Sequence, residues 1–216
     1  MGMLTVTAAA NPPREGLDVL RPDLISIEQQ AALAQQIQLT TQTVKALVLG
    51  RDKADLLVRL TPEAWCVAEC LDHLTQTTCA FLPSISQAIA EAPKLKKNRY
   101  LRTGILSAVF IRILKPPYRM RLKVLPQLAP QKLNSEKAWS AFVDSQSELL
   151  AALSSAAGLA IDEVRVKSPV YARISYNLYG AFRMLAAHQN RHVWQIAQIL
   201  KTLDDQRTPA ALKYSA

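Results

Sequence analysis

The last long helical stretch of the chain reads ISYNLYGAFRMLAAHQNRHVWQIAQILKTLD over residues 174–204. Within it, His188 and His192 stand four residues apart. A helix advances about 3.6 residues per turn, so the two imidazoles lie one above the other on one face. Two histidines placed in this way can bind a single metal ion. The stretch therefore predicts a long helix and a candidate site on it.

Three further long helical stretches precede this one. Apolar residues recur at helical spacing over residues 25–49, where Gly50 ends the pattern. A second stretch covers residues 65–90, and a third covers residues 135–156. The chain thus repeats one kind of element, an amphipathic helix with one apolar stripe.

The order of these elements predicts the fold class. Four long helices and one short helix, at about 101–114, indicate an all-α protein built as a four-helix bundle. Because the connection between the second and third long helices is long and carries the short helix, a crossover topology is favoured over a simple up-and-down one. Strand signals are weak, since only residues 164–166 and 170–171 alternate in polarity.

The chain length suits one domain with a substantial core. We expect a flexible N-terminal arm at residues 1–23, the bundle domain at 24–205 with a basic crossover segment at 92–134, and a C-terminal tail at 206–216. No apolar run reaches the roughly 18 residues that a membrane span needs. The three cysteines lack disulfide spacing, which favours a reducing cytoplasm. They are Cys66, Cys70 and Cys79.

The net charge of +9 comes from the basic crossover alone. Eleven of the 26 Lys and Arg residues, and none of the 17 acidic residues, lie between Ala92 and Ser135. Such a segment can contact nucleic-acid phosphates, lie on an anionic membrane surface, or attract an anionic small ligand. We favour a solvated crossover whose apolar side packs on the domain. Aromatic residues that stack on single strands are sparse here, so this pattern disfavours nucleic-acid binding.

Histidine occurs only three times, as His73, His188 and His192. If His73 comes from a neighbouring helix, the three side chains supply three neutral nitrogen ligands and leave a fourth position open. An open position is typical of a working metal site, whereas structural sites are closed. The alternative is that these histidines are ordinary polar or core residues.

Two segments carry a resemblance to a known family. Residues 65–74, WCVAECLDHL, resemble the opening of the second helix in the DinB/YfiT-like superfamily. Residues 187–196, AHQNRHVWQI, resemble the closing motif on that family's fourth helix. The resemblance covers about residues 25–203 and includes every histidine of the chain.

The resemblance implies a four-helix bundle that holds a divalent metal ion, with His73, His188 and His192 as its ligands. Imidazole suits zinc, nickel and ferrous iron, so the ligand set does not choose the metal. Relatives of this kind include transferases that use a low-molecular-weight thiol cosubstrate, and other members are proposed to be hydrolases. Many members have no assigned reaction, so the resemblance implies a metal bundle more strongly than any substrate.

Two further residues are candidates for supporting roles. Glu69 lies four residues before His73, so it could orient an imidazole or act as a catalytic base. A surface carboxylate paired with a basic neighbour is the equal alternative for Glu69. Gln195 lies three residues after His192, where it would either hold that ring or face inward with a backbone partner.

The leading hypothesis is a cytoplasmic, metal-dependent transferase or hydrolase of small molecules, anionic ones among them. The rival is a non-catalytic bundle that binds a ligand or partner, and nucleic-acid binding through residues 92–134 is the third choice. A homodimer is also expected, because the family often pairs its bundles.

Overall fold

The computed structural model describes residues 25–116, 124, 126–131, 134–171 and 173–207. The predicted N-terminal arm and most of the C-terminal tail therefore lie outside the described residues. The elements follow the predicted order, and the all-α fold is confirmed. The helices are α1 (Ser26–Val48), α2 (Val67–Glu91), α3 (Ile105–Leu114), α4 (Ser135–Ser155) and α5 (Leu178–Arg207), with short 3-10 turns η2 (Asp55–Leu57) and η3 (Pro126–Leu128).

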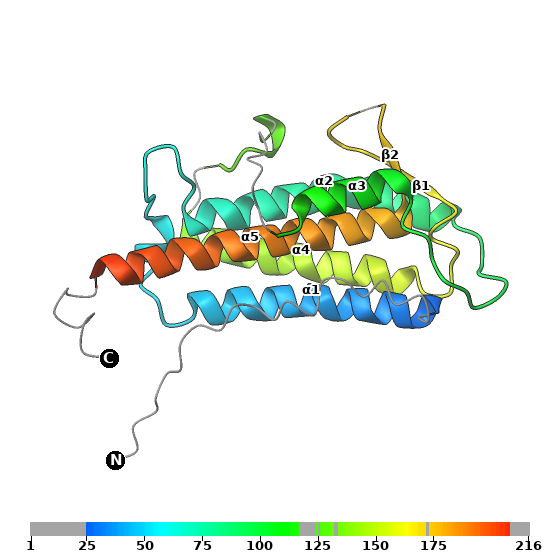
Figure 1. Ribbon diagram of the computed structural model, residues 1–216, viewed down its shortest axis with the longest axis horizontal. Helices are drawn as coiled ribbons and strands as arrows, with labels where there is room; N and C mark the ends of the chain where they lie inside the picture. The colour runs from blue at the N-terminus through cyan, green and yellow to red at the C-terminus, as the bar shows by residue number, and fades with distance from the viewer. Residues whose placement is uncertain (1–24, 117–123, 125, 132–133, 172, 208–216) are drawn as a thin grey trace, which may run out of the picture.

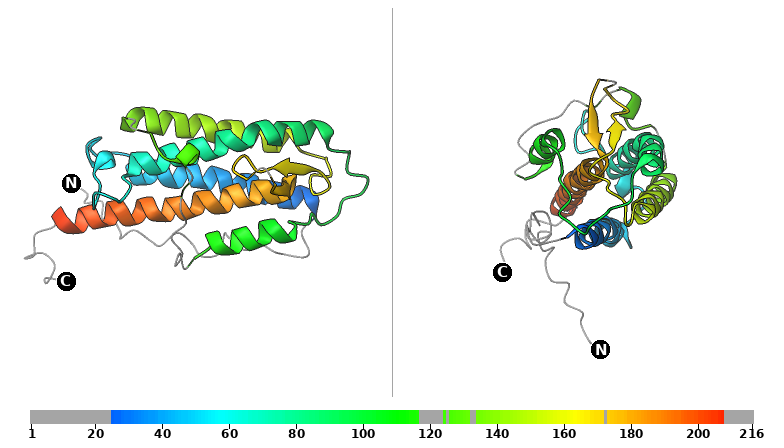
Figure 2. Two further views of the ribbon diagram at one scale, coloured as in Figure 1. Left: turned by 90° about the horizontal axis from the view of Figure 1, so that it is seen from above. Right: turned by 90° about the vertical axis from the view of Figure 1, so that its right-hand side faces the viewer.

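The four long helices lie side by side, and each packs against two others (Figure 1). Helix α3 lies outside this group, against α5, as the end-on view in Figure 2 shows. The connection from α2 to α4 carries α3 and η3, so it has the length and the extra helix expected of a crossover. None of the described helices is long and apolar enough to cross a membrane.

A small β-hairpin precedes α5 and corrects one sequence expectation. Strand β1 (Arg165–Lys167) pairs antiparallel with β2 (Ser175–Asn177), whereas residues 170–171, expected to alternate as a strand, lie in the connection between them. The pairing turns Val166 and Tyr176 onto the core together, which buries both. Helix α5 consequently begins at Leu178, later than predicted.

The side chain of Asn177 ends the hairpin and starts α5. Its Oδ1 accepts a hydrogen bond from the backbone N–H of Gly180 at 2.7 Å, in the manner of a helix N-cap. Its Nδ2 donates to the carbonyl oxygen of Arg102 at 2.7 Å. One amide thus joins the start of α5 to the segment that leads into α3.

Helix α3 packs closely on α5 because residue 180 is glycine. A Cβ at Gly180 would collide with the carbonyl oxygen of Thr103 and the hydroxyl of Ser107. The packed side of α3 buries Ser107, Ile111 and Leu114. The absence of a side chain at Gly180 therefore decides how near α3 can lie.

The core consists of two apolar clusters, one toward each end of the four long helices. On every long helix, buried polar residues stand between the members of the two clusters. We call these residues the polar layer: Thr40, Thr77, Thr78, Ser145, Gln146 and Gln189. The three histidines lie beside this layer, within four residues of Thr77 or Gln189 along their helices.

Candidate metal centre

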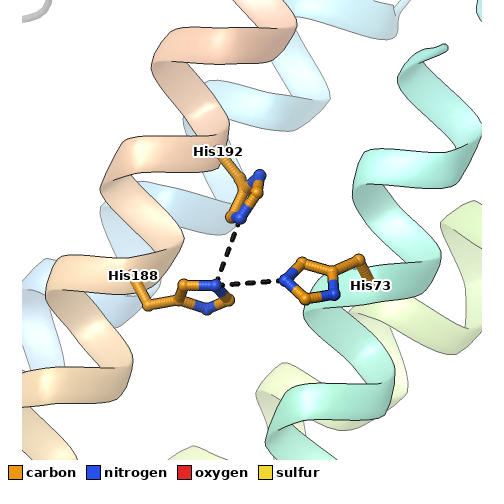
Figure 3. Close-up of side chains that lie close together, drawn as sticks. All are labelled: His73, His188 and His192. Carbon is orange, nitrogen blue, oxygen red and sulfur yellow. Dashed lines mark hydrogen bonds between the residues drawn. The ribbon is translucent and has the colours of Figure 1, made fainter. Parts of the chain in front are cut away.

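The structure brings the three histidines together across two helices. His73 comes from the first turns of α2, and His188 and His192 come from successive turns of α5 (Figure 3). The Nε2 atom of His188 lies 3.2 Å from Nε2 of His73 and 3.1 Å from Nε2 of His192. One ligand atom from each of the three residues lies within 4.8 Å of the others. Three nitrogen atoms therefore converge on one point between α2 and α5.

Hydrogen bonds at the far side of two rings decide which nitrogen faces the centre. His73 Nδ1 lies 2.7 Å from the carbonyl oxygen of Leu128, which can only accept, so Nδ1 carries the proton. His192 Nδ1 lies 3.0 Å from Oε1 of Gln195 and donates to it in the same way. In both neutral rings the Nε2 lone pair then points to the centre.

His188 stands between these two lone pairs. A neutral imidazole carries one proton, so Nε2 of His188 can donate to only one of its two neighbours. One lone pair is left without a donor unless a cation takes the place of the proton. The donor set is three imidazole nitrogens, and the rings of His73 and His192 are held by hydrogen bonds at their outer nitrogens. Such a set suits a divalent metal ion.

Burial keeps all three rings neutral at physiological pH. It is the main cause that lowers the pKa of His73, against the opposing effect of the bond to Leu128. Burial, with the neighbouring His192 and His73, lowers the pKa of His188 well below its ordinary value. Burial, with repulsion from the neighbouring His73 when both rings are protonated, lowers the pKa of His192 to about 3, although the Gln195 bond opposes the shift. Neutral imidazole is the form that binds metal ions.

Trp65 lies against two of the rings. Its ring centroid is 4.9 Å from that of His73 and 5.9 Å from that of His192, and it stacks on His192 with an interplanar angle of 20°. An apolar neighbour in this place limits the access of water to the nitrogens. The centre is therefore bounded by an indole on one side.

Two residues that the sequence interpretation passed over hold the crossover at the site. Asp72, which is buried, accepts a hydrogen bond from the backbone N–H of Gln131 at 2.6 Å. The next residue of α2, His73, is hydrogen-bonded to the carbonyl oxygen of Leu128 in η3. The sequence shows that Asp72 directly precedes His73, but only the structure shows that Asp72 is buried. A backbone carbonyl such as that of Leu128 leaves no signal in the sequence.

Glu69 lies at the start of α2, away from the hydrogen bonds of the centre. Its carboxylate accepts a bond from the backbone N–H of Cys66 at 2.9 Å and forms an ion pair with Arg59. Burial opposes these contacts, but together they lower the pKa of Glu69. The pairing with a basic neighbour matches the alternative weighed from the sequence, but the Glu69 side chain is only 12% exposed and is no surface carboxylate. A role for Glu69 as a base stays a prediction.

The comparisons with known proteins agree with this geometry. The family model of the DinB superfamily matches residues 32–196. The chain belongs to the DinB superfamily. The matched range holds all three histidines, so the motifs that carried the resemblance to the DinB superfamily include the residues that the structure clusters. Comparison with curated proteins and with solved structures gave no match.

Proposed function

We propose that His73, His188 and His192 hold a divalent metal ion, and that the chain is a metal-dependent transferase or hydrolase of small molecules. The observation that carries the proposal is the convergence of three Nε2 atoms. In His73 and His192, the hydrogen bond at Nδ1 leaves the lone pair of Nε2 directed at the centre. Membership of the DinB superfamily supports the same ligand set. Zinc, nickel and ferrous iron all suit three imidazoles.

Bound in this centre, the metal would supply the acidity that turns a water or a low-molecular-weight thiol into a nucleophile near neutral pH. A thiol-dependent S-transferase is the form of this chemistry that we favour. The chain's own residues supply the positioning: Leu128 and Gln195 orient the rings of His73 and His192, and Trp65 restricts water on one side.

Elemental analysis of tag-free protein tests the metal centre. We expect near-stoichiometric zinc, nickel or iron in the wild type and none in His188→Ala. Gln198→Ala is the matched control, because Gln198 lies on the same helix with an exposed side chain. If neither the wild type nor the control holds metal after divalent ions are added back, the proposed centre is wrong.

A second experiment separates an enzyme from a non-catalytic ligand-binding bundle. Metal-loaded protein is screened for transfer of small thiols to electrophilic acceptors and for hydrolysis of small esters and amides. If the chain is an enzyme, His73→Ala should abolish the activity while the circular dichroism spectrum keeps its helical form. Metal binding without any turnover would favour the ligand-binding alternative.

We also propose that the chain forms a homodimer and is located in the cytoplasm. Light scattering coupled to size-exclusion chromatography measures the first, and fractionation of cells that express the chain measures the second. A monomer at micromolar concentration would contradict the dimer.

A further inference from the structure

Helix α3 leaves an apolar face uncovered. Ile105 is 87% exposed, Val109 is 50% exposed and Leu106 is 39% exposed, and no described residue covers them. A helix that is apolar all round is ordinarily buried on all sides. Only one side of α3 packs on α5, while the other points away from the bundle (Figure 2). The sequence led us to expect the apolar side to pack on the domain, and α3 has a second apolar side that does not.

The charged residues in the chain segment that carries α3 are all basic. Arg112 follows Val109 by three residues, so it lies on the same stripe of the helix. Arg112 and Arg102 are exposed, and neither forms an ion pair with another described residue. The exposed Lys94, Lys96 and Lys97 precede them in the chain, and no acidic residue occurs between residues 92 and 135. By contrast, Arg99 is paired with Asp162 and Glu163.

We propose that α3 seats the protein on an anionic membrane surface. We name the contact the α3 outer face: Ile105, Leu106, Ala108, Val109 and Arg112. The helix would lie in the plane of the interface, with its apolar side chains among the acyl chains and its basic residues at the lipid phosphates. This is peripheral binding, in keeping with the finding that no described helix could span a bilayer.

The charge pattern favours lipid over the other occupants of such a face. A second copy of the chain would bring one basic segment against another, and like charges would repel. Nucleic-acid phosphates would attract the lysines and arginines but would leave Ile105 and Val109 in water. An anionic bilayer matches both features at once, because it offers negative headgroups above an apolar layer.

Flotation of the full chain with vesicles tests the proposal. We expect binding to vesicles of phosphatidylcholine and phosphatidylglycerol, little binding to phosphatidylcholine alone, and weaker binding as salt rises. Replacing Lys96 and Lys97 with glutamine should weaken binding about fivefold for each lysine. The matched control, Lys137→Gln with Lys201→Gln, removes the same charge from exposed positions on α4 and α5 and should change binding much less.

The apolar residues have their own test. Ile105→Asn with Val109→Asn should weaken binding on the order of tenfold or more while every basic residue is retained. Ile27→Asn with Leu39→Asn is the control, because both residues are exposed on α1, 66% and 50%. A blue shift of the tryptophan emission of Ile105→Trp on vesicle addition, beyond that of the wild type, would show directly that the face enters the bilayer.

Several results would overturn the proposal. Absence of binding to anionic vesicles at low salt is the simplest. Equal binding by the wild type and the Ile105→Asn, Val109→Asn variant would mean that charge alone acts and the face does not insert. A dimer that dissociates in that variant would make the face an interface between two copies. Binding of duplex DNA without binding of vesicles would assign the basic segment to nucleic acid.

Discussion

His73 donates a hydrogen bond from Nδ1 to the carbonyl oxygen of Leu128, 2.7 Å away and 55 residues later in the chain. The bond joins α2 to the crossover and leaves the Nε2 lone pair of His73 directed at His188. The long connection between α2 and α4 is therefore part of the centre, since it decides the tautomer of one proposed ligand.

Removing the anchor of the crossover should weaken metal binding. Asp72→Ala deletes the carboxylate that accepts from the backbone N–H of Gln131, which frees the turn that carries Leu128. We expect metal affinity to fall about tenfold, the lower end of the effect of lost outer hydrogen bonds. Isothermal titration with zinc measures it. Gln76→Ala removes the other partner of Asp72 and should leave the affinity nearly unchanged, so equal losses in both variants would contradict this role.

Gln195 offers a similar test on α5. Gln195→Ala removes the acceptor for His192 Nδ1, so the ring can turn and the other tautomer becomes available. A loss of about tenfold or more in metal affinity is expected. Gln195→Glu keeps an acceptor in place and should restore binding. If alanine and glutamate bind metal equally well, Gln195 does not position the ring.

The polar layer should contain a residue whose replacement by an apolar one stabilises the protein. Both amide atoms of Gln146 are buried and have no hydrogen-bond partner in the described structure. Gln146→Leu exchanges this amide for an apolar group of similar size, so we expect the free energy of unfolding to rise by about 1 kcal/mol. Urea denaturation measures it. Gln35→Leu, at an exposed position on α1, should change stability by less than about 0.5 kcal/mol. A less stable Gln146→Leu would mean that ordered water satisfies the amide.

Asp162 should contribute a stability that depends on pH. Burial alone would raise its pKa, but the bonds from Arg99 and from the backbone N–H of Arg102 outweigh burial and lower it. Its contribution is therefore present above the unfolded-state pKa and is lost as pH falls through the folded-state pKa. At pH 7, Asp162→Asn should cost about 2 kcal/mol of unfolding free energy.

The measurement for Asp162 is urea denaturation of both proteins from pH 7 down to acid. The gap between the wild type and Asp162→Asn should narrow as the carboxyl of Asp162 takes up its proton. Glu163→Gln, which removes the exposed partner of the same arginine, should cost less than about 1 kcal/mol at every pH. A difference in unfolding free energy that stays constant with pH would contradict an electrostatic origin of the contribution of Asp162.

Gly180 should be intolerant of a methyl group. Gly180→Ala places a Cβ against the carbonyl oxygen of Thr103 and the Ser107 hydroxyl, so α3 or α5 must shift. We expect a loss of about 1–3 kcal/mol despite the better helix propensity of alanine. Thermal unfolding checks the loss. Adding Ser107→Ala removes one of the three collisions, the others being with the Thr103 carbonyl and Asn177 Oδ1, and should recover part of the stability. A fully stable Gly180→Ala would contradict the close packing.

Much of this molecule follows from patterns that are local in the chain. Helical spacing of apolar residues is enough to predict long helices, because each amphipathic stripe is written within one segment. His188 and His192 can be predicted to share one helix face for the same reason, because both lie in a single segment. The hairpin before α5 was missed because its strands are short and are stabilised by pairing with one another.

The geometry of the metal centre and the exposure of α3 depend on tertiary structure. That His73 meets His188 depends on how α2 packs against α5, and the acceptor from Leu128 is a backbone atom that every residue possesses. The exposure of Ile105 likewise depends on which side of α3 meets α5. Helix periodicity and the three histidines could be predicted from the sequence because they are properties of single segments. Ring orientation and the uncovered face of α3 could not, because they arise between segments far apart in the chain.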